Sequence, residues 1–370
     1  MTSDNSFSVL YEFTAQTTAE AEKAADEIAR EQTAELPSDA IPPALQKFVG
    51  DVSKPSQSSA GRFQCTITYD TKTVGKDLLQ FLNVLFGNIS IKPDIKLLDF
   101  DLGGLAPLFP GPAVGIDGIR ERLSIHDRPL SCTALKPMCS DPVSLANIAF
   151  EATLGGIDII KDDHGLANQS MAPFRERVSQ CCDAVRRAEQ ESGKRTLYFP
   201  NVTTRFEDLE ENIAFAKEAG ADGILMIPEL TGLATLASLV QMDSGLPIMA
   251  HPAFSGPYTI HLHSGFTPAL HYGKLWRALG ADAVIYPNAG GRFAYTRQQC
   301  LNINRALREP LHSFKSAFPV PGGGIDRNTV SDWKNLYGNN TIFLIGGSLY
   351  LHPEGLKTAV QEFQRSLSAR

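Results

Sequence analysis

Eight short apolar segments, each followed by a stretch with helical periodicity, dominate the sequence after residue 130. Continuous apolar strands that alternate with helices are typical of a parallel sheet covered on both faces. Eight such units match a (β/α)8 barrel, an α/β fold in which helices enclose a ring of strands. A doubly wound open sheet is the alternative, although the GxGxxG turn common after its first strand is missing. The segments are 131–137, 157–163, 196–202, 223–229, 246–252, 283–289, 317–323 and 341–347.

The first part of the chain lacks this regular alternation of strands and helices, and its pattern predicts a small α+β sandwich. Residues 62–70 alternate apolar and polar side chains, as a half-buried strand does, and an Ala/Glu-rich helix precedes them at 17–32. A Pro/Gly-rich stretch at 108–115 ends this part. We therefore expect an α+β N-terminal domain over 1–115 and a barrel that carries the active site over 116–370.

Charge and composition narrow the classes of partner. The chain has 370 residues and a net charge of −7, with no basic run, whereas a duplex nucleic-acid binder normally presents a basic face. No window approaches the roughly 20 apolar residues of a membrane span, and the N-terminus lacks a signal-peptide pattern. The six cysteines show no CxxC spacing, so we interpret them as reduced thiols of a cytoplasmic protein. We expect neither a nucleic-acid nor a membrane partner.

Polar residues follow the predicted barrel strands at the ends where (β/α)8 enzymes carry their chemistry. One such residue alone is explained at least as well as a hydrogen-bonded group at the barrel rim. Six or more strand ends together predict an active site. In chain order they are Lys136, residues 161–164, Asn201, Glu229, His251, Asn288, glycines 322–324, and glycines 346–347 with Ser348.

Glycine runs end the last two predicted strands, at 322–324 and 346–347. Glycine lets backbone N–H groups approach an anion closely, and a following helix adds partial positive charge. The loops after strands 7 and 8 are the usual phosphate site of this fold. Simple glycine turns are the alternative, but the pairing on both strands favours phosphate.

The Lys-Asp-Asp-His segment at the end of the second strand combines a lysine with carboxylates. Strand alternation directs Lys161 and Asp163 to one side and Asp162 to the other. The segment is either a solvated charge cluster or a metal site. In a metal site, a carbamate formed from Lys161 and CO2 would add oxygen ligands for Mg2+ beside Asp163. His251 is either a general acid–base group or a structural histidine.

Several blocks of this sequence resemble the large-chain family of ribulose-bisphosphate carboxylase (RuBisCO). GGIDIIKDDHGLANQSMAPFRERV resembles the metal-binding stretch of that family, and FPGPAVGIDGIRERLSIHDRPL resembles its domain junction. LKP, PGGGI and GGSLYLHP match further blocks, so the resemblance covers essentially the whole chain. It implies a homodimer in which the N-terminal domain of one subunit covers the barrel mouth of the other.

The resemblance also implies a role for each matching residue. Lys161 would be the carbamylated lysine, Asp163 a metal ligand, and Lys136 the lysine that handles the proton on the enolisable carbon. His251 would be the strand-5 histidine, and Arg292 lies where the mobile loop after strand 6 normally has a lysine. The residues that would bind a phosphate are Gly323, Gly324, Gly346 and Gly347. The N-terminal residues that would reach the neighbouring subunit's site are Asn88 and Glu31.

Four departures from the family pattern distinguish this chain from the carboxylases. His164 replaces the glutamate of the metal triad, and an imidazole shifts the preference from Mg2+ towards other divalent metals. Met138 replaces the second lysine after strand 1, and Pro252 and Gly322 replace an arginine and a serine that hold a second phosphate. We therefore expect a substrate with one phosphate and no CO2 fixation, as in a RuBisCO-like protein.

RuBisCO-like proteins resemble RuBisCO in forming a metal-stabilised enediolate from a phosphorylated ketose. The string KDDHGLANQ most resembles members of the apionate pathway. We therefore expect decarboxylation of 3-oxo-isoapionate 4-phosphate, with the enediolate protonated by Lys136 or His251. Three alternatives stay open: transcarboxylase or hydrolase cleavage of that substrate, enolase or isomerase work in methionine salvage, and a non-catalytic sugar-phosphate-binding protein.

Overall fold

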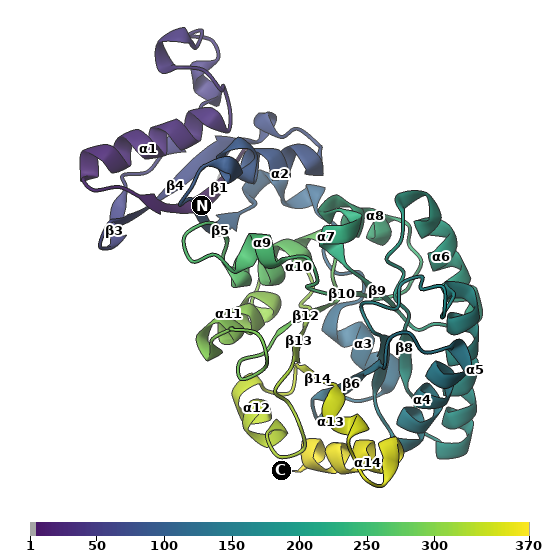
Figure 1. The fold of residues 1–370 in the computed structure, drawn as a ribbon. Coiled ribbons are helices and arrows are strands. Elements are labelled where there is room, and N and C mark those ends of the chain that lie inside the picture. The colour runs from purple at the N-terminus through teal and green to yellow at the C-terminus, as the bar shows by residue number, and fades with distance from the viewer. Residues whose placement is uncertain (1–4, 370) are drawn as a thin grey trace. The chain divides into compact units, whose positions relative to one another are not determined.

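The computed structural model describes residues 5–369, and the chain divides into two compact units (Figure 1). The N-terminal unit ends at Phe109 and also contains residues 255–271, whereas the barrel unit begins at Pro110. The sequence pattern had placed the boundary at 115 and had assigned residues 255–271 to the barrel. That segment joins the N-terminal unit because β11 (Gly265–Phe266) pairs with β5 (Lys96–Asp101).

A mixed sheet with covering helices forms the N-terminal unit. Its strands lie in the order β11-β5-β1-β4-β2, with β3 beside β4, and all pairs except β11–β5 are antiparallel. The other strands are β1 (Ser6–Thr14), β2 (Asp51–Val52), β3 (Ser56–Ser59) and β4 (Arg62–Asp70). The helices are α1 (Thr18–Glu31), α2 (Leu78–Phe86), α9 (Gly256–Thr259) and the 3-10 helices η1 (Ser38–Ala40), η2 (Gln46–Phe48), η3 (Thr71–Thr73), η4 (Asn88–Ile91) and η5 (Gly103–Leu108).

Aromatic side chains fill the core of the N-terminal unit. Alternate residues of β1 are buried, as a strand with one covered face requires. Phe7 of β1 stacks on Tyr69 with ring centroids 5.3 Å apart, and Phe81 of α2 meets Phe109 edge to face at 5.0 Å. Phe81 also contacts Phe7, with centroids 5.8 Å apart, so these rings hold α2 against the sheet.

Eight parallel strands form the ring of the barrel unit, and they coincide with the eight apolar segments of the sequence. Neighbours pair in the order β8-β7-β6-β14-β13-β12-β10-β9. The ring closes where Asn201 bridges Leu225 and the Val202 N–H donates to the Leu225 carbonyl. The expected (β/α)8 class is confirmed. The strands are β6 (Leu130–Leu135), β7 (Ile159–Asp162), β8 (Leu197–Phe199), β9 (Ile224–Met226), β10 (Ile248–Ala250), β12 (Ala283–Pro287), β13 (Phe318–Gly322) and β14 (Ile342–Ile345).

Helices enclose this ring (Figure 1). In chain order they are α3 (Gly115–Leu123), α4 (Pro142–Gly155), α5 (Phe174–Ser192), α6 (Phe206–Ala219), α7 (Pro228–Thr231), α8 (Leu233–Gln241), the π-helix η6 (Ala269–Leu275), α10 (Trp276–Leu279), α11 (Arg297–Arg308), α12 (Val330–Tyr337), α13 (Gly347–Tyr350) and α14 (Gly355–Ser368).

Helix α3 closes the amino-terminal end of the ring. Ile116, Ile119 and Leu123 pack into one core cluster with apolar residues of the barrel strands. The buried Asp282 carboxylate fixes the start of this helix, because it accepts hydrogen bonds from the N–H groups of Val114 (2.8 Å) and Gly115 (2.7 Å). Apolar packing therefore occupies this end, and the polar strand ends lie at the opposite, carboxyl end.

Two further sequence expectations concern the whole chain. All six cysteines are free, and five of them are buried. Among residues 5–369, no helix combines the length and the apolar character that a membrane crossing needs.

Candidate active site at the carboxyl ends of the barrel strands

Strand β7 directs its last residues to opposite faces, as the alternation predicts. The buried Asp162 carboxylate faces the surrounding helices, where it accepts hydrogen bonds from Arg177 Nε (3.0 Å) and the Tyr198 hydroxyl (2.8 Å). Lys161, before it, is only 2% exposed, and its charge acts on Asp163. Asp162 therefore anchors the segment to the helices. Lys161 and Asp163 remain as the candidate site residues of this strand end.

Asp163 is the centre of a cluster of polar side chains. The Lys136 ammonium forms an ion pair with its Oδ2 atom, and His164 Nδ1 lies 3.0 Å from its Oδ1 atom. Burial alone would raise the pKa of Asp163, but the hydrogen bonds from His164 and Lys136 and the charge of Lys161 hold that pKa well below its usual range. The carboxylate is therefore ionised at neutral pH and already binds a cation, the ammonium of Lys136.

Lys161 is buried, and the charge of Asp163 acts on its amine. Burial lowers the pKa of its amine, although the Asp163 carboxylate opposes this effect. The Nζ atom donates to the Asp162 carbonyl at 2.9 Å. A lowered pKa increases the fraction of neutral amine, which is the form that reacts with CO2.

Two histidines complete the cluster. The rings of His164 and His251 stack with centroids 4.7 Å apart and planes 8° from parallel. Burial and the charge of Lys161 hold the pKa of His251 well below its usual range, so this imidazole is neutral. Its Nδ1 atom accepts a hydrogen bond from the Ala253 N–H at 3.1 Å. The Nε2–H group is therefore the one that can donate to a ligand.

The glycine turn after β14 lies on the strand next to Lys136. Strand β14 pairs with β6 through Ile345 and Thr133, so the turn at Gly346 and the end of β6 are neighbours. A Cβ atom added at Gly346 or Gly347 would meet no other atom within 4 Å. This turn therefore presents its backbone to open space, as an anion cradle requires.

The glycine turn after β13 packs against another glycine turn. Gly323 and Gly324 adopt left-handed backbone conformations with φ of +99° and +66°. A Cβ atom at Gly324 would lie 2.8 Å from the carbonyl carbon of Gly290, in the loop after β12. Only glycine fits there, because both the φ angle and the backbone contact exclude a side chain.

Replacing Gly324 with alanine is expected to weaken phosphate binding about tenfold, since forcing a residue into an unfavoured backbone region costs of order 1–3 kcal/mol. Gly193→Ala is the matched control, because Gly193 has the same φ of +66° but open space around it, at the end of α5. Titration with inorganic phosphate by calorimetry measures the effect. Equal phosphate affinity in Gly324→Ala and Gly193→Ala would contradict the assignment.

Three other predicted residues have neighbours of their own. Arg292 is exposed, with its guanidinium 5.1 Å from the centroid of the Phe293 ring. In the N-terminal unit, Asn88 Nδ2 donates to Glu31 Oε1 at 3.2 Å and to Glu35 Oε1 at 3.0 Å. The structure thus brings Asn88 and Glu31 together, although they are far apart in the sequence.

Asp163 and His164 would supply two donors to a divalent cation. Among residues 5–369, no three His, Cys, Asp or Glu side chains are grouped so that they could hold a metal ion. A carboxyl group on Lys161 would add the missing oxygen donor. The ionised Asp163, which pairs with an ammonium in this structure, and the buried amine of Lys161 together fit a cation site of this kind.

Two further residues, Arg177 and Asn201, support this cluster. Arg177 on α5 holds Asp162 and also donates to the carbonyls of Ala172 (2.7 Å) and Ala167 (2.9 Å). Asn201 donates through its backbone N–H to Asp162 (2.8 Å) and through Nδ2 to the His164 carbonyl (2.9 Å). Asn201 was recognisable as a polar strand end, whereas nothing near Arg177 in the sequence signals its role.

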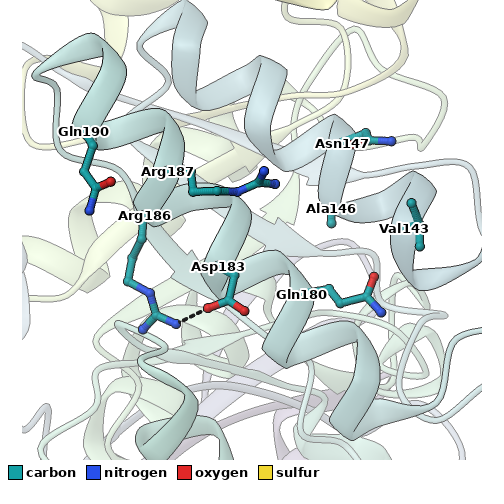
Figure 2. Close-up of a pocket in the computed structure, with 8 residues that line it drawn as sticks. All are labelled: Val143, Ala146, Asn147, Gln180, Asp183, Arg186, Arg187 and Gln190. Carbon is teal, nitrogen blue, oxygen red and sulfur yellow. Dashed lines mark hydrogen bonds and ion pairs between the residues drawn. The ribbon is translucent and has the colours of Figure 1, made fainter.

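A separate groove of about 570 Å³ lies between α4 and α5, on the outside of the barrel (Figure 2). Its walls contain the exposed Arg186–Asp183 ion pair and none of the predicted site residues. This groove is therefore distinct from the candidate active site.

Comparison with known proteins agrees with the geometry. The model of the family "Ribulose bisphosphate carboxylase large chain, catalytic domain" matches residues 115–370. The 5-methylthioribulose-1-phosphate isomerase of Rhodospirillum rubrum is 39% identical over 90% of this chain and 88% of its own. The 2,3-diketo-5-methylthiopentyl-1-phosphate enolase of Geobacillus kaustophilus is 37% identical over 82% of this chain and 74% of its own. The crystal structure of a RuBisCO-like protein from Rhodopseudomonas palustris superimposes with a TM-score of 0.90, at 34% identity and 99% coverage of both chains.

Proposed function

Because this chain belongs to the ribulose bisphosphate carboxylase large-chain family and is a RuBisCO-like protein, we propose that it moves protons next to the carbonyl group of a phosphorylated ketose. The observation that carries this proposal is the cluster of Lys136, Asp163 and His251 beside the glycine turn of the neighbouring strand. The relatives named as methylthioribulose-phosphate isomerase and as diketo-methylthiopentyl-phosphate enolase support a substrate with one phosphate.

Each group of the cluster has a chemical role in this proposal. Backbone N–H groups of the turns at Gly323, Gly324, Gly346 and Gly347 hold the phosphate and thereby orient the carbon chain. Lys136 moves the proton at the carbon next to the carbonyl. The Nε2–H group of His251 donates to an oxygen that gains negative charge. Lys161 as a carbamate, Asp163 and His164 would hold a divalent cation, which polarises the carbonyl when bound.

Decarboxylation of 3-oxo-isoapionate 4-phosphate is the second candidate reaction. Loss of CO2 leaves an enolate that needs a proton donor and no base. Lys136, which its ion pair with Asp163 places in the cluster, would supply this proton. The position of Lys136 therefore suits the decarboxylase candidate as well, whereas the similarity of the relatives supports isomerisation or enolisation.

Product analysis tests the proposal. The protein is incubated with Mg2+ and bicarbonate and with three substrates in turn: 5-methylthioribulose 1-phosphate, 2,3-diketo-5-methylthiopentyl 1-phosphate and 3-oxo-isoapionate 4-phosphate. We expect an isomer or enol product from one of the first two, without release of CO2. Release of CO2 from the oxo acid selects the decarboxylase candidate, and phosphoglycerate with glycolate selects transcarboxylase or hydrolase cleavage. Thermal stabilisation by these compounds without turnover would contradict an enzymatic function and indicate a binding protein.

We also propose a cytoplasmic homodimer in which each N-terminal unit supplies Asn88 and Glu31 to the partner's barrel. Two features, one in each unit, support the dimer. Ile91, close to Asn88, is 84% exposed. On loops at the carboxyl ends of the barrel strands, Met138, Phe254 and Leu351 are also exposed. Exposed apolar groups of this kind often mark a protein interface.

The six free thiols support a cytoplasmic location.

Mixing two inactive variants tests the shared site. Asn88→Ala removes a group from the N-terminal unit, and Lys161→Met disables the barrel. Random exchange of subunits produces heterodimers with one intact site, so we expect about a quarter of wild-type activity in the refolded mixture. The controls are each variant refolded alone. A mixture as inactive as its components would contradict the shared site.

A further inference from the structure

Tyr350 connects the glycine turn after β14 with the end of strand β6. It is the last residue of α13, the short helix that begins at Gly347. Its hydroxyl donates to the carbonyl of Ala134 at 2.7 Å and accepts a hydrogen bond from the backbone N–H of Lys136 at 3.3 Å. One side chain therefore links the backbone that carries Lys136 to the turn proposed to bind phosphate.

The two hydrogen bonds have different consequences. The bond to Ala134 satisfies a carbonyl inside β6, and a purely structural tyrosine would need nothing more. The bond from Lys136 lies one residue beyond the last residue of β6, where the strand can no longer fix the backbone. Burial raises the pKa of Tyr350 to about 12, so the hydroxyl stays protonated in neutral solution. Both hydrogen bonds therefore persist under working conditions.

The side chain of Lys136 depends on this backbone position. Its ammonium reaches Asp163, the residue directly after the adjacent strand β7, and the Lys136 side chain is partly exposed. Without the Tyr350 hydroxyl, the Lys136 N–H would lose its acceptor and the residue could turn away from Asp163. The angle at which the ammonium enters the site would then no longer be fixed.

We propose that Tyr350 is a positioning residue that holds Lys136 in register with the glycine turn after β14. This inference rests on the proposed role of Lys136 in proton transfer. It predicts that loss of the hydroxyl slows the chemical step while leaving substrate binding nearly unchanged, because the glycine turns keep their own backbone.

Tyr350→Phe removes only the hydroxyl. Tyr272→Phe is the matched control, since Tyr272 is buried and its hydroxyl contacts another phenol, that of Tyr295, at 3.2 Å. The first measurement needs no substrate: acetylation of individual lysines by a small acylating reagent, followed by mass spectrometry, with the exposed Lys76 as internal standard. The second is steady-state kinetics with whichever substrate the product analysis identifies.

In Tyr350→Phe we expect Lys136 to be acetylated several-fold faster relative to Lys76, because an amine no longer held against Asp163 is free to reach the reagent. We also expect kcat to fall about tenfold, the scale of one lost hydrogen bond, with KM within about twofold of the wild-type value. Tyr272→Phe should change neither quantity.

An unchanged Lys136 acetylation rate in Tyr350→Phe would overturn the inference, as would a higher KM with an unchanged kcat. If no compound is turned over, the proposed function fails, while the acetylation result still decides whether Tyr350 positions Lys136.

Discussion

Replacing Lys161 with methionine is expected to lower kcat at least about a thousandfold, because a bound cation contributes several kcal/mol and each 1.36 kcal/mol is a factor of ten. Methionine has a similar length and is apolar, so it fits the site of a side chain that is 2% exposed. The variant cannot form a carbamate and would therefore lose the third donor beside Asp163 and His164. Calorimetric titration with Mg2+ in bicarbonate should show the matching loss of binding.

The melting temperature separates this effect from misfolding. Lys161→Met removes a buried ammonium, whose desolvation opposes folding, so the variant should melt no lower than the wild type. Substantial activity of the folded variant, or undiminished Mg2+ binding, would contradict the assignment of Lys161.

Replacing Arg177 with methionine is expected to cost about 3–5 kcal/mol of the free energy of unfolding, because one partner of a buried ion pair is lost. The guanidinium and the Asp162 carboxylate are both fully buried, with Nε 3.0 Å from Oδ2. The variant leaves the Asp162 charge without a cation and also frees the carbonyls of Ala167 and Ala172. Urea unfolding followed by circular dichroism measures the loss.

Arg186→Met is the matched control for this prediction. Arg186 lies on the same helix and pairs with Asp183 on the surface, in the groove between α4 and α5 (Figure 2). An exposed pair contributes about 0–1 kcal/mol. Adding Asp162→Asn to Arg177→Met should recover part of the loss, since the uncompensated charge disappears. A cost for Arg177→Met no larger than that for Arg186→Met would show that the buried pair is not an anchor.

The barrel could be predicted from the sequence because its strands are buried on both faces. Strands such as β9 and β10 therefore show continuous apolar runs, which mark each strand without reference to distant residues. The polar residues at the ends of these strands could be recognised because they interrupt the apolar runs. The opposite directions of Lys161 and Asp162 followed from the period of two along a strand.

Long-range contacts explain what the sequence did not reveal. Residues 255–271 join the N-terminal unit through β11 and through Lys96, whose Nζ donates to the carbonyls of His261 (2.5 Å) and Leu262 (3.1 Å). Neither contact has a local pattern. Strand β3 was missed because all of its residues are exposed, so its side chains do not alternate. Nothing next to Tyr350 or Arg177 in the sequence signals their roles, because both lie on helices and their partners lie at strands β6 and β7.

Solvent proton exchange tests the central claim most directly. The protein is incubated in deuterium oxide with Mg2+, bicarbonate and the phosphorylated ketose, and the carbon next to the carbonyl is followed by NMR. Isomerisation, enolisation and decarboxylation share one intermediate with negative charge on that carbon and the adjacent oxygen. We predict that the wild type introduces deuterium at this carbon and that Lys161→Met does not. Turnover with no deuterium at this carbon in either the product or the recovered substrate, or equal exchange by Lys161→Met, would contradict the account.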